Sequence, residues 1–309
     1  MPALTVIVTS YRSPRLLRLC LVALGAEVER LGPAGARPEV ELIVADDGDP
    51  EHQSRGPAVA AAATGLFSAV RRLWQVHDGY GKCRLANKAA RAARTPLLLY
   101  LDGDSLLAPG ALAAHLRLQG PRRYVAGNQL RLGARASEAV DESLAASRRY
   151  ASPLWLLPWS MRRGGLETKP HYAWLRALGL GRLLRRRGRG GFNGGCSSLP
   201  KALLEQVNGW DEALAGYGFD DTDLGHRLQN AGAEPVEARL EAMVVHLFHE
   251  RPYRGADAAY ERKRRTVAAS LRGAQVRATR GLAEQGPHDP SAWEELPGPA
   301  SSGAARYRA

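Results

Sequence analysis

Cysteine is scarce in this chain, and the few cysteines present do not form a known motif. Only three of the 309 residues are cysteines, and Cys20, Cys83 and Cys196 lie far apart. An odd number of widely spaced cysteines excludes a disulfide framework, and the absence of a C-x-x-C pair excludes the usual cysteine metal or redox site. Such cysteine usage is typical of proteins from a reducing compartment, so we expect a cytoplasmic protein.

Long apolar runs are also missing. The longest nearly uncharged run covers only residues 57–70, whereas a membrane-spanning helix needs roughly 18 to 20 apolar residues. The first residues pass directly into a strand-like pattern, without a basic segment followed by an apolar stretch. We therefore expect neither a spanning segment nor a secretory signal.

Two common nucleotide-binding motifs are absent as well. No G-x-G-x-x-G follows the first apolar run, and no G-x-x-x-x-G-K-[ST] occurs anywhere in the chain. These glycine patterns let the backbone approach the phosphates of dinucleotides and nucleoside triphosphates. The sequence thus argues against a dinucleotide-binding Rossmann site and against a P-loop.

What the chain does contain is the alternation of strands and helices typical of an α/β fold. Apolar, strand-like runs cover residues 4–9, 41–45, 73–76 and 97–101, and helical patterns begin at Pro14 and cover 82–93. Polar and acidic residues follow several of these runs, and ligands of open α/β sheets bind at the carboxyl ends of strands. We predict a mainly parallel, Rossmann-like sheet flanked by helices, with residues 1–119 forming a nucleotide-binding half.

The remainder of the chain divides into four further segments. Residues 120–191 lose periodicity and are interpreted as an irregular, partly helical, Arg-rich insert. Residues 192–256 are expected to complete the same domain, with helices at 200–207 and 221–231 and a strand at 241–247. Residues 257–281 are typical of a charged surface helix, and the Pro-, Gly- and Ser-rich residues 282–309 predict a flexible tail.

Positive charge is in excess and is concentrated in two places. The formal net charge is +12, with five arginines within residues 182–189 and nine basic against two acidic residues between 251 and 280. These two segments account for the whole excess. Such patches attract nucleic acid, anionic acceptors or anionic membranes, but the first patch has no aromatic residue for base stacking, which makes nucleic acid an unlikely partner.

Two carboxylates follow the last of the strands in the first half. Asp102 and Asp104 are separated by Gly103, which allows the chain to bend so that both carboxylates can approach one cation. Oxygen ligands of this kind suit Mg²⁺ or Mn²⁺ bound to a diphosphate. The alternative is an ordinary helix cap before a helix at 106–118.

A second acidic constellation lies in the other half. Trp210, Asp211 and Glu212 are followed by a glycine- and aromatic-rich loop that ends in Asp220 and Asp221. A carboxylate at a helix start is stabilised in its ionised form and can act as a general base toward a hydroxyl group. The alternative is a simple acidic first turn.

Together these segments resemble a family 2-type glycosyltransferase with the GT-A fold. The resemblance covers about residues 4–250 outside the insert, and its later part is most similar to the galactosyltransferase-like domain of β-1,4-galactosyltransferases, chondroitin synthases and polypeptide N-acetylgalactosaminyltransferases. It is carried by the segments VTSY (8–11), IVADDG (43–48), RLANK (84–88), LDGD (101–104), GWDE (209–212) and GYGFDD (216–221).

This resemblance implies an inverting, metal-dependent transfer of one hexose or N-acetylhexosamine from a UDP-sugar to an acceptor hydroxyl. It implies Mn²⁺ or Mg²⁺ as cofactor, and as acceptor a glycan, a lipid-linked compound or a small molecule, with peripheral contact to an anionic membrane. The matched positions give nucleotide-sugar contacts at Thr9, Tyr11, Asp46, Asp47, Arg84 and Asp102, metal ligands at Asp104, His246 and Asp102, and catalytic Asp221 and Asp220, with His249, Trp210 and Asn193 as additional candidates.

The chain departs from the family pattern at the acidic loop. Phe219 replaces a glycine, and Asp220 replaces a glutamate; both changes narrow the expected acceptor pocket. Other functions left open by the residues are a nucleotidyltransferase, a glycosidase, since paired carboxylates serve that chemistry too, and a noncatalytic protein on the same scaffold that docks anionic partners through its arginines.

Overall fold

A computed structural model describes residues 3–33, 35–48, 53–167, 171–188, 191–214, 216–250, 258–286 and 292–299. One sheet runs through this part of the chain, in the order β10-β3-β2-β1-β4-β8-β6-β9-β5, with β7 paired to β9. The strands are β1 (Leu4–Ser10), β2 (Val40–Asp47), β3 (Ala69–Gln75), β4 (Leu97–Asp102), β5 (Ser105–Leu107), β6 (Arg123–Arg131), β7 (Arg186–Arg187), β8 (Cys196–Pro200), β9 (Glu234–His246) and β10 (Trp293–Leu296).

The first half of the sheet is parallel, as predicted. Strand β1 pairs in parallel with β2 and β4, and β2 pairs in parallel with β3. The register places Thr9 opposite Ala45 on one side and opposite Asp102 on the other. Because these four strands run in the same direction, the polar residues that follow them meet at one edge of the sheet.

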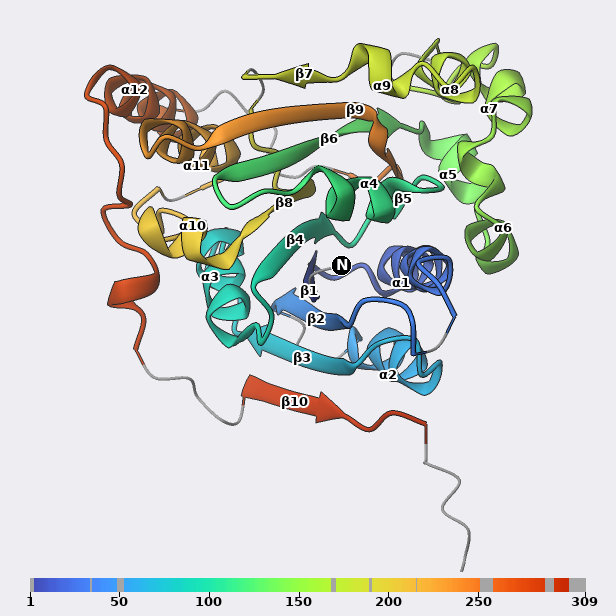
Figure 1. Ribbon diagram of the computed structural model, residues 1–309, viewed down its shortest axis with the longest axis horizontal. Helices are drawn as coiled ribbons and strands as arrows, with labels where there is room; N and C mark the ends of the chain where they lie inside the picture. The colour runs from blue at the N-terminus through green and yellow to red at the C-terminus, as the bar shows by residue number, and fades with distance from the viewer. Residues whose placement is uncertain are drawn as a thin grey trace, which may run out of the picture.

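Helices cover both faces of this parallel half (Figure 1). Helices α1 (Pro14–Glu29) and α2 (Arg55–Ala63) lie on one face, and α3 (Lys82–Ala92) lies on the other, where α10 (Lys201–Gln206) and α11 (Asp220–Asn230) also lie. Alternate residues of β1 point to opposite faces: Val6 and Val8 join the core beneath α1 and α2, whereas Ile7 joins the core beneath α3.

The second half of the sheet corrects the prediction of an irregular segment from residue 120 onward. Strand β6 lies within that segment, pairing antiparallel with β8 and parallel with β9. Its sequence, RYVAGNQLR, has no clean alternation because it is interrupted by polar residues and Gly127, and pairing with two neighbours outweighs this weak local signal. The strand predicted at 241–247 is likewise longer, since β9 begins at Glu234.

The rest of the insert is built from short helices. These are α5 (Ala134–Glu138), α6 (Glu142–Ser147), α7 (Pro153–Ser160), α8 (His171–Ala177) and α9 (Gly181–Leu184), with the 3₁₀ turn η1 (Arg149–Ala151). They gather at one end of the molecule (Figure 1). Before the insert, the helix predicted at 106–118 is shorter, because β5 takes up Ser105–Leu107 and α4 covers Ala111–Leu118.

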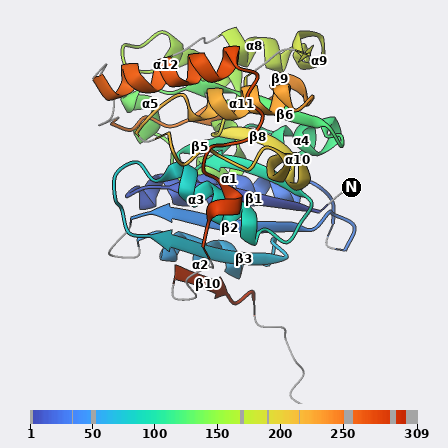
Figure 2. The same ribbon diagram turned by 90° about the vertical axis from the view of Figure 1, so that its left-hand side faces the viewer.

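The C-terminal segments are only partly as predicted. Helix α12 (Ala258–Arg272) is a charged helix that lies across the top of the molecule beside α11 (Figure 2). The predicted flexible tail instead contains the turn η2 (Leu282–Glu284) and strand β10, which pairs antiparallel with β3. Leu296 is buried, and Glu294 and Glu295 form ion pairs with Arg55 and Arg94. Residues 300–309 of that prediction lie outside the described residues.

No helix within the described ranges has both the length and the apolar character that crossing a bilayer requires.

Candidate active site

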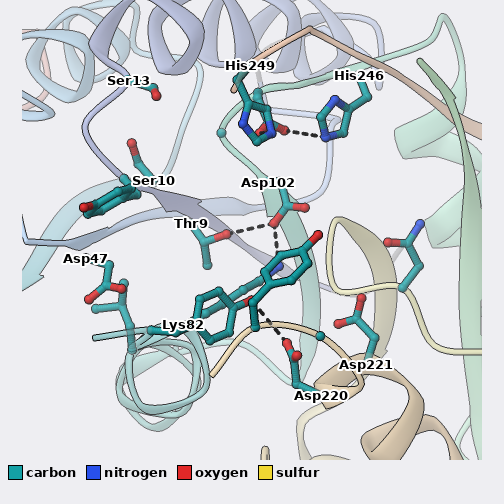
Figure 3. A pocket seen from close by; sticks show the side chains of 18 of the residues that line it. Thr9, Ser10, Ser13, Asp47, Lys82, Asp102, Asp220, Asp221, His246 and His249 are labelled. Atoms are coloured by element: carbon teal, nitrogen blue, oxygen red, sulfur yellow. Dashed lines mark hydrogen bonds and ion pairs between the residues drawn. The ribbon is translucent and has the colours of Figure 1, made fainter. Parts of the chain in front are cut away.

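The polar ends of the strands surround a cavity of about 590 Å³ (Figure 3). This is within the usual range for a small-ligand site, roughly 300 to 1,000 Å³. Its walls come from segments far apart in the sequence: the residues after β1 and β4, the ends of β2 and β9, the start of α3, part of β6 and the loop before α11. The sequence-predicted residues that line it are Thr9, Tyr11, Asp47, Asp102, Asp104, Asn193, Asp220, Asp221, His246 and His249.

Three side chains at one side of the cavity form a candidate metal centre. The carboxylate of Asp104 lies 3.4 Å from Nε2 of His246 and 3.1 Å from Nε2 of His249. The possible ligand atoms of these three residues all lie within 4.8 Å of one another. Neighbouring ligands of an octahedral Mn²⁺ or Mg²⁺ ion stand about 3 Å apart, so the geometry suits such an ion.

The hydrogen bonds of the two histidines favour metal binding. Nδ1 of His246 donates to the carbonyl of Leu247 at 2.7 Å, and Nδ1 of His249 donates to the carbonyl of Glu250 at 2.8 Å. Since a carbonyl oxygen only accepts, Nδ1 carries the proton in both rings, and in the neutral ring Nε2 keeps its lone pair toward Asp104. Burial raises the pKa of the Asp104 carboxyl, but Lys82 and the protonated forms of His246 and His249 outweigh burial and hold that pKa at about 2.

Asp102 occupies a different position from Asp104. Its Oδ1 accepts hydrogen bonds from Nζ of Lys82 at 2.7 Å and from the hydroxyl of Thr9 at 3.1 Å. It is not a member of the cluster formed by Asp104 and the histidines, so the prediction of Asp102 as a metal ligand has no support in this arrangement. Gly195 lies directly behind Asp102, where any side chain would collide with Oδ2.

The acidic pair lies across the cavity, at the start of α11 (Figure 3). Phe219, at the helix cap, has φ of 62°, a left-handed conformation that glycine adopts more easily. Asp220 is buried and accepts a hydrogen bond from the hydroxyl of Tyr80 at 3.4 Å, while Nζ of Lys263 in α12 lies 3.5 Å from it. Asp220 is therefore held by protein partners from two other segments.

Asp221 has the environment of a general base. Burial is the largest cause that raises its pKa, Asp220 and Asp102 raise it further, and Lys82 and the Gly194 amide lower it, giving a pKa of about 7. The sequence led us to expect that a helix start would stabilise the ionised form. The structure shows the opposite balance, because burial and two neighbouring carboxylates outweigh the helix terminus.

Three predicted site residues lie outside the cavity lining. Trp210 is completely buried, packed against Tyr100 and Phe192 at ring distances of 5.4 and 5.5 Å, so it belongs to the core and cannot stack on a sugar. Asp46 is also buried and is not among the lining residues. Arg84 points to Gln75, with Nε 3.1 Å from Oε1, and its predicted place beside the nucleotide is not supported.

The remaining predicted residues form two small arrangements. The ring of Tyr11 lies 4.7 Å from that of His77, whose Nδ1 is 3.6 Å from Asp47. Asp47 also accepts from Gln75 Nε2 at 2.7 Å and from the Gly81 amide at 3.0 Å. On the opposite wall, Asn193 Oδ1 accepts from the Gly195 amide at 3.1 Å and shapes the turn behind Asp102.

Sequence reasoning missed several residues of the cavity. The most important is Lys82, whose ammonium group lies between Asp102 and the acidic pair; the only available signal was its place after Gly79-Tyr80-Gly81 at a helix start. Gly194 was missed too, although a side chain there would collide with Asp221 and lie 2.6 Å from Cη2 of Trp210. Further lining residues are Gln129, Arg131, Tyr80 and Tyr217.

Comparisons with known proteins identify a family and a fold for this chain. Residues 2–269 match the family model described as "Glycosyltransferase like family 2". Two curated relatives, both named validoxylamine A glucosyltransferase, come from Streptomyces hygroscopicus subsp. jinggangensis (strain 5008) and subsp. limoneus. Each is 27% identical over 267 residues, which is 82% of this chain and 57% or 53% of the relative. The chain thus spans little more than half the length of the curated relatives it matches.

Two solved structures share the fold. One is the mannosyltransferase PcManGT from Pyrobaculum calidifontis in complex with GDP-Man and Mn²⁺, with a TM-score of 0.52 and 17% identity, covering 94% of this chain and 66% of that one. The other is GalNAc-T7 with UDP, GalNAc and Mn²⁺, with a TM-score of 0.54 and 14% identity, covering 89% and 50%. At these identities the likeness confirms the predicted fold.

Proposed function

The chain belongs to the glycosyltransferase like family 2, and on that premise we propose that it is an inverting, metal-dependent glycosyltransferase that moves one hexose or N-acetylhexosamine from a UDP-sugar to an acceptor hydroxyl. The observation that carries this proposal is the cavity itself. A cluster of metal-ligating side chains and a carboxylate with a pKa near 7 face the same space, at the carboxyl edge of a parallel sheet.

The donor nucleotide is proposed to lie along the ends of β1 and β2. Tyr11 and His77 offer adjacent rings for the base, and Asp47, held in place by Gln75 and Gly81, offers oxygens beside them. The two neighbouring structures contain UDP in one case and GDP-Man in the other. We favour a uridine nucleotide because Thr9 and Tyr11 match positions that hold the uracil and ribose of a UDP-sugar in the family that the chain resembles, and a guanosine donor is the alternative.

Mn²⁺ or Mg²⁺ is proposed to be held by Asp104, His246 and His249. When bound, such an ion neutralises charge on the diphosphate leaving group. Nζ of Lys82 lies 2.7 Å from Oδ1 of Asp102 and keeps that carboxylate oriented. Asp102, with Thr9, is then placed to contact the ribose.

The acidic pair supplies the acid–base part of the reaction. In an inverting transfer the acceptor oxygen bonds to the anomeric carbon, the bond from that carbon to the UDP oxygen breaks, and the acceptor proton passes to a base. Asp221 lines the cavity and has a pKa of about 7, so its ionised form can take the proton. Asp220, bound by Tyr80 and Lys263, positions the start of α11.

The acceptor is proposed to enter between Asp221 and the aromatic side chains of the neighbouring loops. Tyr80 and Tyr217 pack edge to face with ring centres 5.6 Å apart, and Tyr217 is 41% exposed. Aromatic faces of this kind suit a sugar or cyclic polyol, so a glycan, a lipid-linked sugar or a small molecule would fit. Galactose and N-acetylgalactosamine are candidate donor sugars because residues 209–223 resemble galactosyltransferase-like domains, and glucose is a candidate because of the names of the curated relatives.

We also propose a cytoplasmic location, on the ground that the three cysteines are buried and free. Peripheral contact with an anionic membrane would depend on the basic segments outside the cavity.

Calorimetry with UDP-sugars and GDP-sugars in the presence of Mn²⁺ tests the proposal, together with detection of released nucleotide. We expect binding of a UDP-hexose that chelator removes. Asp104→Asn and His249→Ala should each lower cation affinity by at least about 10- to 100-fold, the loss that removal of an outer-shell partner alone already causes. His226→Ala, on the outer part of α11, is the matched histidine control and should bind normally. If no nucleotide sugar binds with Mn²⁺ present, the transferase function is wrong and a noncatalytic docking function gains support.

A further inference from the structure

Exposed apolar side chains are concentrated on one part of the molecule. Among the described residues, ten large hydrophobic side chains are exposed, and six of them lie within residues 154–183. These six belong to helices α7, α8 and α9 and the turns that follow them: Leu154, Leu157, Met161, Trp174, Leu178 and Leu183. We call this set the α7–α9 face. The three helices lie side by side at one end of the molecule (Figure 1).

Helix α7 is apolar on both of its sides. Leu156 is buried, and Trp159 packs against the core. Leu154, Leu157 and Met161 are spaced by three and four residues, which places them on one helix face, and they are 81%, 38% and 80% exposed. A surface helix ordinarily presents polar residues on its outer side, so the outer side of α7 has the composition of a contact surface.

The same part of the chain is strongly basic. Glu167 is the one acidic residue between positions 149 and 188, against arginines at 149, 162, 163, 176, 182, 185, 186 and 187 and Lys169. Arg162, Arg163 and Arg182 are exposed, and the guanidinium of Arg162 lies 5.5 Å from the ring of Trp159. Arginine can bury its methylene stem beside apolar groups while its charge reaches outward.

The α7–α9 face is connected to the cavity wall. The Glu167 amide donates to the carbonyl of Arg131 at 3.0 Å, and Leu166 forms a bridge with Leu132. Arg131 itself lines the cavity. A surface bound by α7–α9 would therefore lie next to one wall of the candidate active site.

We propose that the α7–α9 face docks onto the surface of an anionic lipid bilayer. Leucine, methionine and tryptophan side chains enter the boundary between headgroups and acyl chains, and the arginines contact lipid phosphates. The exposed apolar side chains distinguish this face from α12, where Arg262, Arg264 and Arg265 are exposed and, among the side chains of that helix that the structure describes, no large hydrophobic one is exposed beside them. The proposal concerns binding alone and does not depend on the donor or on catalysis.

Co-sedimentation with vesicles tests this, using phosphatidylcholine alone and phosphatidylcholine with phosphatidylglycerol, without nucleotide sugar. We expect binding to the anionic vesicles only. Replacing Leu154, Met161, Leu178 and Leu183 by Ser should lower the partition coefficient by about tenfold or more. Replacing Arg162, Arg163 and Arg182 by Gln should lower it by about fivefold for each arginine at low salt. Circular dichroism of both variants should match the parent, because all these side chains are exposed.

Two controls separate this face from general attraction between charges. Val59→Ser removes an exposed apolar side chain on α2, and the triple change of Arg262, Arg264 and Arg265 to Gln removes exposed charge from α12; both should bind nearly as the parent does. The proposal is overturned if the parent chain does not bind, if neutral and anionic vesicles bind equally, or if the α12 variant loses binding while the apolar variant keeps it. A dimer that the apolar variant abolishes, without vesicle binding, would show that a second copy covers the face.

Discussion

Replacing Asp221 by Asn should make the fold more stable at pH 8 while abolishing sugar transfer. The pKa of the Asp221 carboxyl is raised from 3.8 to about 7 in the folded protein. A carboxyl with a raised folded-state pKa binds its proton more tightly in the folded than in the unfolded chain. Its contribution to stability is therefore fully present below pH 4 and is lost as the pH rises to about 7. Asparagine has a similar shape and no charge to bury.

The size of the effect follows from the shift. About three pKa units at about 1.4 kcal/mol each correspond to roughly 4 kcal/mol at pH 8. Asp221 lines an open cavity, where solvent screens part of that cost, so we expect about half, near 2 kcal/mol. At pH 5 the carboxyl is protonated in the folded chain and ionised only in the unfolded chain. The increase in unfolding free energy caused by Asp221→Asn should therefore shrink to below about 1 kcal/mol.

Urea unfolding of the parent and Asp221→Asn chains at pH 5 and pH 8, in chelator and without donor, measures this difference. Calorimetry of the same variant should show unchanged donor binding with Mn²⁺, alongside lost transfer to an acceptor. An equal change in unfolding free energy at both pH values would refute the raised pKa. Equal loss of donor binding and transfer would assign Asp221 a structural role and place the base elsewhere.

Two further predictions use neighbours of Asp221. The rate of transfer should fall as the pH drops below about 7, because the base must be ionised. Lys82 lowers the pKa of Asp221 and Asp220 raises it, so Lys82→Met should move the acidic limb of the kcat profile to higher pH and Asp220→Asn should move it to lower pH. Shifts in the same direction for both variants would contradict this electrostatic account. Gly194→Ala should destabilise the fold by about 1 to 3 kcal/mol and impair transfer, because the added methyl group would collide with Asp221 and Trp210. The control variant Gly191→Ala has open space around the added methyl group, so its thermal unfolding should be nearly unchanged.

The strands that could be predicted are those whose amino-acid pattern matches the surroundings that they have in the fold. Strands β1, β2 and β4 are continuous apolar runs because both of their faces are covered by helices. Strand β6 was missed because its sequence is polar and its pairing comes from β8 and β9, which lie more than 60 residues further along the chain. Strand β10 was missed for a similar reason, since only the exposed edge of β3 gives WEEL a partner.

The candidate site shows the same limit. The motifs of the family resemblance located Asp104, His246 and the acidic pair: Asp104 lies between β4 and β5, His246 ends β9, and the acidic pair opens α11. Spacing along the sequence does not show which side chains at the start of α3 point into the cavity. Lys82 lines the cavity, and Arg84, two residues later, does not. Trp210 sits in a conspicuous motif, yet its bulk is used to fill the core behind Gly194.

The charge of the whole chain and the charge of its cavity have opposite signs. The chain carries a net +12, but the cavity is lined by six carboxyl side chains against three lysine and arginine side chains. A nucleoside diphosphate would be repelled by such a lining unless a divalent cation accompanied it. The excess of basic over acidic residues comes from residues 182–189 and 251–280, and Lys263 of α12 reaches Asp220. The proposed cation dependence of donor binding and the proposed attraction to anionic surfaces therefore rest on different residues of the same chain.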